Sequence, residues 1–236
     1  MNRVFTNTVA AELSKLRGLP AVMTAMHGTV AASIVLSAAV AAATDEANVV
    51  QVVVQIVPFV QIGFLIVGVL AVATEYEGRQ IRTALTATPN RPLFLAAKTI
   101  AFVTAAATTS AASVGAALAT ASVTLRGGSL SFVDSRPLAG AAVYLVLIGL
   151  LGFAVTVLFR SLIPPLVTML AVVLIASPLL ASVTEHARWL PDRAGRLLYL
   201  SNADPILTPG TGALVLVAWI AVIAVVATWT FWSRDA

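Results

Sequence analysis

The chain has 236 residues, of which 59% are hydrophobic and only 10% are charged, and its formal net charge is +4 at pH 7. Soluble domains carry about 25% charged residues, so we expect lipid, and not water, to be the main solvent of this chain. The absence of cysteine excludes disulfides, thiol catalysis and cysteine metal sites. We interpret the small basic excess as a marker of membrane topology and expect no nucleic-acid partner.

Residues 1–19 are polar enough to remain outside the membrane core. Phe5, Val9, Leu13 and Leu16 recur there at helical spacing among charged residues. This pattern predicts a helix that lies on the membrane surface. The alternative is a positively charged flank before a first span.

Six apolar segments are long enough to cross a bilayer, which takes roughly 20 residues each. They cover roughly residues 21–43, 49–73, 93–124, 138–159, 164–183 and 213–232. The expected fold is an all-α membrane protein, with residues 1–236 forming a single transmembrane domain. Small residues at the end of the first segment also fit a signal-peptidase site, which leaves a cleaved signal peptide as an alternative.

Two of these spans have a distinctive composition. Pro58 lies inside the second span, where proline usually kinks a helix. The middle of the third span consists almost entirely of small residues. Because helices in membranes associate by close backbone approach, we expect the third span to be buried among the others.

The distribution of lysine and arginine predicts the orientation. With a cytoplasmic N-terminus, nine of the fourteen fall in the inner segments 1–19, 74–98, 160 and 233–236, and five in the outer segments 44–48, 125–137 and 185–211. Cytoplasmic loops carry the excess of these residues. Both termini are therefore expected in the cytoplasm.

The sequence contains no motif of known catalytic or metal chemistry. His27 and His186 stand far apart, and the pair Glu185-His186 fits a polar cap at the membrane surface better than a base or metal pair. Neither lysine belongs to a Gly-Lys-Ser or Gly-Lys-Thr phosphate loop. We expect no catalytic, cofactor or metal residue in the chain, so that ATP, if used, must be hydrolysed by a partner.

Amides supply the polar groups within the spans. Asn48, Gln51 and Gln55 follow the spacing i, i+3, i+7 and share one face of a helix. This stripe predicts either the lining of a transport pathway or the seam between two copies. Ordinary hydrogen bonding between helices is the alternative.

The longest charged interruption between spans is Glu75–Lys98. Within it, residues 80–87 are expected to form a short helix that ends before Pro89, because proline disfavours helix at the residue before it. A short helix held between two spans is a rigid projection that a soluble partner could grip. The alternative is a solvated loop that only orients the spans.

These segments together resemble the ABC-2 type ABC transporter permeases, in particular the drug-export-like permeases of actinobacteria. The resemblance covers essentially the whole chain and depends on the order of several short patterns. These are residues 12–17 (ELSKLR), 75–77 with Arg79, 81–85 (IRTAL), 89–91 (PNR), 97–98, 190–191, 194–195 and 234–236.

The resemblance implies the transmembrane subunit of an ATP-driven exporter in the bacterial cytoplasmic membrane. Such a permease pairs with a second permease copy and with ATPase subunits, which bind ATP and Mg²⁺. It would have an N-terminal interfacial (connecting) helix, a cytoplasmic coupling helix and short outer re-entrant helices near Trp189-Leu190 and Leu197–Leu200. The implied coupling residues are Glu75, Tyr76, Glu77, Gly78, Arg79, Ile81, Arg82 and Leu85, and those of the connecting helix are Glu12, Lys15 and Arg17.

The expected function is therefore export of an amphiphilic or hydrophobic cargo (a drug, peptide antibiotic or lipid), as in multidrug efflux. A membrane scaffold that anchors a soluble cytoplasmic partner, without transport, is the alternative.

Overall fold

The computed structural model describes residues 2–44, 48–77, 91–125, 135–200 and 204–233, which are helical apart from short connections and contain no strand. The long helices are α1 (Asn2–Gly18), α2 (Pro20–Ala42), α3 (Val49–Glu77), α5 (Arg91–Thr124), α6 (Ser135–Phe159) and α10 (Pro209–Ser233). The short ones are α7 (Ile163–Ala171), the π-helical turn η1 (Val172–Ala176), α8 (Ser177–Val183), the 3₁₀ turn η2 (Glu185–Trp189) and α9 (Pro191–Arg196).

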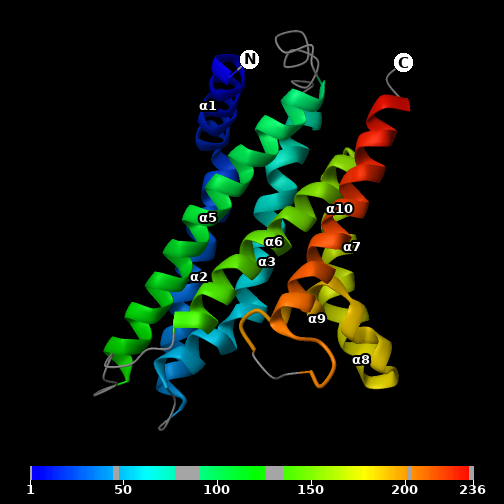
Figure 1. Ribbon diagram of the computed structural model, residues 1–236. Coiled ribbons are helices and arrows are strands. Elements are labelled where there is room, and N and C mark those ends of the chain that lie inside the picture. The colour runs from blue at the N-terminus through cyan, green and yellow to red at the C-terminus, as the bar shows by residue number, and fades with distance from the viewer. Residues whose placement is uncertain (1, 45–47, 78–90, 126–134, 201–203, 234–236) are drawn as a thin grey trace.

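Six helical segments are long and apolar enough to cross a membrane, as expected of a multi-pass membrane protein. They are Pro20–Ala42, Val49–Tyr76, Pro92–Thr124, Ser135–Phe159, Ile163–Val183 and Pro209–Thr230. The expectation of an all-helical fold with six candidate spans is thus confirmed. Both chain termini lie at one end of the bundle, here called the terminal end, and α9 lies at the opposite end, here called the α9 end (Figure 1).

The centre of the bundle is the contact between α3 and α6, the most extensive between any two described helices. Glycines allow this contact, since a Cβ atom on Gly68 would meet the carbonyl oxygen of Gly149 in the facing helix. Gly152 is also near α3, since a Cβ there would lie 3.2 Å from the carbonyl oxygen of Leu65. The two helix backbones can approach closely because Gly68, Gly149 and Gly152 carry no side chain.

The small residues of α5 bury this helix only in part. In its most apolar stretch 39% of residues are buried, against 67% in α3 and 61% in α6. The small side chains of α5 pack mainly against α2, where Ser37 Oγ donates a hydrogen bond of 2.7 Å to the carbonyl of Ala117. The expectation that α5 would be enclosed by the others was therefore too strong.

A polar pair lies inside the apolar centre. The Tyr144 hydroxyl of α6 donates to Gln61 Oε1 of α3, and both side chains are buried. The Gln61 amide also donates to the carbonyl of Pro58 at 2.8 Å. Because buried polar groups are costly unless they are paired, these bonds fix the register between α3 and α6.

The fifth span is not one regular helix. It consists of α7, the π turn η1 and α8, and the Ser177 amide donates to the carbonyl of Val172. Pro178 follows directly and has no N–H to donate, while its ring would clash with the carbonyl four residues before it. The wider π turn before Pro178 relieves this conflict.

At the α9 end, the chain between α8 and α10 folds back onto the bundle. A Cβ on Gly195 would meet the Tyr144 ring, and one on Gly212 would meet the carbonyl of Ala194. The rings of Tyr144 and Tyr199 are 5.2 Å apart. α9 therefore packs against α6 and α10 through positions without side chains.

Candidate functional site

A cluster of four charged side chains joins three helices at the terminal end. It consists of Glu12 and Lys15 from α1, Glu75 from α3 and Lys98 from α5, and is called the ion cluster below. Glu12, Glu75 and Lys98 are buried, with exposed fractions of 3%, 3% and 5%. Two carboxylates and two ammonium groups balance the formal charge.

Lys98 is the centre of the ion cluster. Its Nζ lies 2.6 Å from Glu75 Oε1 and 2.9 Å from Glu12 Oε2, so that one ammonium group donates to carboxylates on two other helices. Lys15 Nζ lies 2.6 Å from Glu12 Oε1 and 3.8 Å from Glu75 Oε1, at the solvent-facing side. Each Glu12 oxygen therefore has a different lysine as its partner.

An aromatic ring contributes to the same site. The Nζ atoms of Lys15 and Lys98 lie 5.7 Å and 5.6 Å from the ring centroid of Phe94, within the range of cation–π attraction. Glu75 Oε2 is buried without a hydrogen-bond partner in the described chain. A small cavity of about 20 Å³ beside Glu75, Tyr76 and Lys98 has room for one water molecule.

The charges around Glu12 control its ionisation. Burial alone would raise the pKa of the Glu12 carboxyl, but the positive charges of Lys98 and Lys15 outweigh burial and hold the pKa below its ordinary value. Glu12 is therefore ionised at neutral pH, as the ion pairs require. The cluster therefore joins α1, α3 and α5 through ion pairs.

The local sequence explains how these side chains meet. Glu12 and Leu16 lie one turn apart on α1, and among the side chains of this helix that the structure describes they are the two buried ones. α3 continues four residues beyond the predicted end of the second span at residue 73, so Glu75 lies in its last turns and faces the bundle. α5 begins at Arg91, which places Phe94 and Lys98 four residues apart on one face.

The predicted coupling and connecting residues have different locations. Glu75 belongs to the ion cluster, Tyr76 is partly buried beside it, and Glu77 ends α3. Glu12 and Lys15 belong to the cluster, whereas Arg17 is exposed near the end of α1. Gly78, Arg79, Ile81, Arg82 and Leu85, and the short helix predicted over residues 80–87, lie outside the described residues.

The predicted amide stripe lies along the exposed side of α3 near the α9 end. Asn48, Gln51 and Gln55 are all exposed, although the residues between them are mostly buried. Asn48 Oδ1 accepts the Val50 amide at 3.0 Å, and Gln51 Oε1 accepts the Asn48 amide at 3.3 Å, so two of the three amides cap the start of α3. Gln55 forms no hydrogen bond to another described residue.

Sequence reasoning missed Lys98 and Phe94 as members of the site. One signal was available, because Lys98 is the only charged residue between Arg91 and Arg126. A lone lysine in an apolar helix generally needs a carboxylate partner. Which carboxylates supply it depends on how α1, α3 and α5 pack, and short sequence patterns do not contain that information.

The fold and the buried ion cluster define a helical, multi-pass membrane protein whose terminal end is held together by charge. The chain matches no protein-family model and no curated protein.

Proposed function

We propose that this chain is the transmembrane permease subunit of an ATP-driven ABC exporter. The observation that carries the proposal is the ion cluster, which links α1, the end of α3 and the start of α5. The segment 78–90, which contains five of the predicted coupling residues, begins directly after Glu77 and ends directly before Arg91. Both of its attachment points therefore belong to helices that Lys98 ties together.

Buried ion pairs give this region the rigidity that coupling requires. Separating a buried ion pair leaves an uncompensated charge, which costs about 3–5 kcal/mol. A push on segment 78–90 would therefore move α1, α3 and α5 as one unit. In this proposal α1 is the connecting helix on the inner membrane surface, and both termini are cytoplasmic.

The exposed amides on α3 support a second permease copy. Gln51 and Gln55 lie on a span yet face away from the chain's own core. Exposed amides are unfavourable against lipid, since hydrocarbon offers them no hydrogen-bond partner. We assign this stripe to the seam or the pathway between two permeases.

The fold at the α9 end is consistent with an outer re-entrant element. α9 packs at Tyr144, which is nine residues, or roughly 14 Å at 1.5 Å per residue, from the start of α6. In the proposal, η2 and α9 dip back into the outer leaflet of a bacterial cytoplasmic membrane. The six candidate spans contain a single carboxylate, Glu75, in the last turns of α3, and this favours an amphiphilic or hydrophobic cargo over ion-coupled transport.

The proposal requires a separate ATPase that binds ATP and Mg²⁺. The test is to purify the tagged full chain from its native membranes and to identify the proteins that accompany it. We expect an ABC ATPase whose hydrolysis, measured in nanodiscs, depends on this chain. Recovery of a soluble partner that is not an ATPase would overturn the exporter assignment and favour a membrane scaffold.

The coupling assignment can be tested in the assembled complex. Arg79→Glu and Arg82→Glu should each reduce transport-coupled ATP hydrolysis, whereas Arg126→Glu, a matched charge reversal in the predicted outer loop, should leave it unchanged. Wild-type coupling in both inner variants would refute the docking assignment even if the ATPase copurifies.

A further inference from the structure

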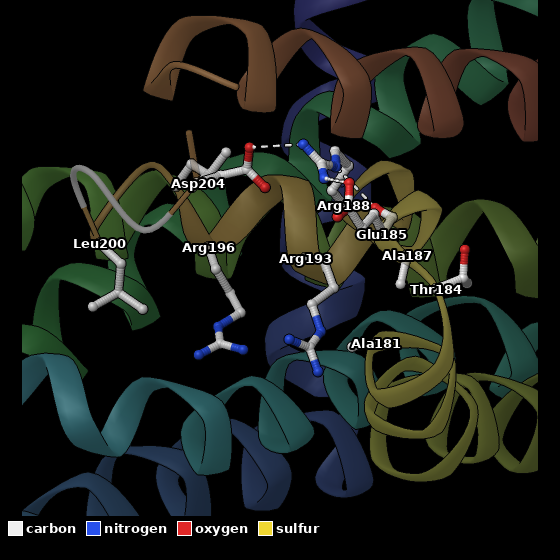
Figure 2. A pocket seen from close by; sticks show the side chains of 10 residues that line it. Ala181, Thr184, Glu185, Ala187, Arg188, Arg193, Arg196, Leu200 and Asp204 are labelled. Carbon is white, nitrogen blue, oxygen red and sulfur yellow. Dashed lines mark hydrogen bonds and ion pairs between the residues drawn. The ribbon is translucent and has the colours of Figure 1, made fainter. Parts of the chain in front are cut away.

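A polar cavity of about 260 Å³ lies at the α9 end, far from the ion cluster. The end of α8, the turn η2 and the helix α9 border this open cavity (Figure 2). Three arginines line it, namely Arg188, Arg193 and Arg196, together with the carboxylates Glu185 and Asp204. So many guanidinium groups are unusual at the end of a membrane bundle with few charges.

The two carboxylates are both used by Arg188. Arg188 Nη2 lies 3.0 Å from Glu185 Oε2, and Nη1 lies 3.5 Å from Asp204 Oδ1. Asp204 Oδ1 also accepts the backbone amides of Ile206 and Leu207. The positive charge of Arg188 is therefore compensated within the chain.

Arg193 and Arg196 differ from Arg188 in their interaction partners. They lie three residues apart on α9 and extend side by side, away from the Arg188 pairs (Figure 2). Neither forms an ion pair with a carboxylate in the part of the chain that the structure describes. Arg193 Nε donates to Ser177 Oγ at 3.3 Å, and Arg196 Nε is buried with no hydrogen-bond partner among these residues.

The carboxyl group of Asp192, the residue before Arg193, offsets at most one of these two charges. Ser177 donates to Asp192 Oδ2 at 2.5 Å, and burial raises the pKa of the Asp192 carboxyl although Ser177 and Arg193 act against it. Burial also raises the pKa of Tyr199 to about 12 in spite of the adjacent positive charge of Arg196, so Tyr199 stays neutral. Two like charges one turn apart repel each other unless an anion lies between them.

We propose that this cavity is a phosphate-binding site in which the guanidinium groups of Arg193 and Arg196 hold the phosphate of an anionic phospholipid. Guanidinium groups present a planar fork of donors that matches phosphate oxygens, and each group can donate two parallel hydrogen bonds to them. Arg188, whose charge is compensated by Glu185 and Asp204, also lines the cavity. An anionic phospholipid brings a net negative charge to the two guanidinium groups, whereas a zwitterionic lipid brings a cationic group beside its phosphate and no net charge.

The surroundings identify lipid as the source of the phosphate. The cavity lies where the candidate span Ile163–Val183 ends, and this is the level of lipid headgroups. Leu179 and Val183, with exposed fractions of 61% and 84%, offer α8 as an apolar surface for acyl chains. Trp219 Nε1 donates to the carbonyl of Trp189 at 2.9 Å, which joins α10 to the end of η2.

The test uses the full chain in phosphatidylcholine nanodiscs or detergent. Phosphatidylglycerol, or inorganic phosphate in a separate arm, is titrated, and binding is measured by native mass spectrometry and by the shift in melting temperature. Arg193→Gln and Arg196→Gln should each weaken phosphatidylglycerol binding about tenfold, the scale of one charge-assisted hydrogen bond. Arg136→Gln, an exposed arginine at the start of α6, is the matched control and should not change binding.

The variants Arg193→Lys and Arg196→Lys keep the positive charge and control for misfolding of the glutamine variants. They should weaken binding less than the glutamine variants do. Binding of inorganic phosphate as tight as that of phosphatidylglycerol would support the phosphate site and assign it to a soluble anion. Equal affinity of the wild type for phosphatidylglycerol and phosphatidylcholine, or equal weakening by Arg136→Gln, would overturn the proposal. The outcome is independent of whether an ATPase partner exists.

Discussion

Lys98 Nζ lies 2.6 Å from Glu75 Oε1, and both side chains are buried although they come from different membrane helices. The same ammonium group reaches Glu12 of α1 at 2.9 Å. One lysine thus joins three helices at the end of the bundle from which segment 78–90 leaves. The terminal end is held by charge, whereas the centre is held by close packing of α3 on α6.

Replacing Lys98 should be the most destabilising single change in the ion cluster. Lys98→Met keeps much of the side-chain volume but leaves Glu12 and Glu75 without their shared buried partner. We expect a loss of about 3–5 kcal/mol in the free energy of unfolding. The measurement is equilibrium unfolding in mixed micelles, followed by circular dichroism.

Lys15→Met is the matched control, because Lys15 has an exposed side chain (41%) and an ion pair with the same Glu12. Exposed ion pairs contribute up to about 1 kcal/mol, so this variant should be nearly as stable as the wild type. Adding Glu12→Gln and Glu75→Gln to Lys98→Met should restore much of the loss, since no buried charge then remains unpaired. Equal effects of Lys15→Met and Lys98→Met would contradict the central role of Lys98.

The depressed pKa of Glu12 predicts a loss of stability in acid. A carboxyl whose pKa is lower in the folded than in the unfolded state stabilises the fold fully above its unfolded pKa, whose ordinary value is 4.5. That contribution disappears as the pH falls below 4.5 and through the lower folded pKa. The melting temperature of the wild type should therefore fall more steeply on acidification below pH 4.5 than that of Glu12→Gln.

Glu185→Gln provides the comparison for this pH series, because the Glu185 side chain is 88% exposed. Its acid profile should follow that of the wild type. A Glu12→Gln variant with an unchanged acid profile would show that other carboxyls account for the pH dependence.

Hydropathy was sufficient to predict the spans, because each membrane helix must satisfy its own backbone and expose apolar side chains along its length. Hydropathy could not, however, predict that Glu75 is buried. Glu75 was placed in a polar connection, since a carboxylate two residues past an apolar run normally marks the end of a span. Only the packing of α1 and α5 against α3 supplies the lysine that allows Glu75 to be buried.

The π turn in the fifth span and the packing of α9 were also not predictable from the sequence. Pro178 signals a disturbance in the helix, but the π turn before it is one of several ways to relieve the missing bond. Gly195 and Gly212 do not stand out in the sequence, because glycine is common in loops. Their function in the fold, which is to let α9 approach Tyr144 and α10, depends on contacts between distant segments.

Removing the Tyr144 hydroxyl should weaken the central contact. Tyr144→Phe leaves Gln61 Oε1 buried without its partner, and an unsatisfied buried group costs about 1–3 kcal/mol. The double variant Tyr144→Phe with Gln61→Leu removes both partners and should recover most of this loss. Unfolding of Tyr144→Phe, Gln61→Leu and the double variant together gives the coupling energy.

Tyr199→Phe serves as the control for the aromatic change. The Tyr199 hydroxyl is buried without a hydrogen-bond partner in the described chain, so its removal should leave stability equal or slightly higher. Destabilisation by Tyr199→Phe as large as by Tyr144→Phe would show that the cost comes from repacking the ring and not from Gln61.

The close approach of α3 and α6 predicts intolerance of even one methyl group. A Cβ at position 68 would meet the backbone carbonyl of Gly149, which cannot move away as a flexible side chain could. Gly68→Ala should therefore force the helices apart and cost about 1–3 kcal/mol. Gly115→Ala is the matched control, because a Cβ there meets no atom within 4 Å and alanine favours the helix by up to about 1 kcal/mol. Opposite shifts in melting temperature for the two variants are expected, and a stabilising Gly68→Ala would contradict the glycine contact at the centre of the bundle.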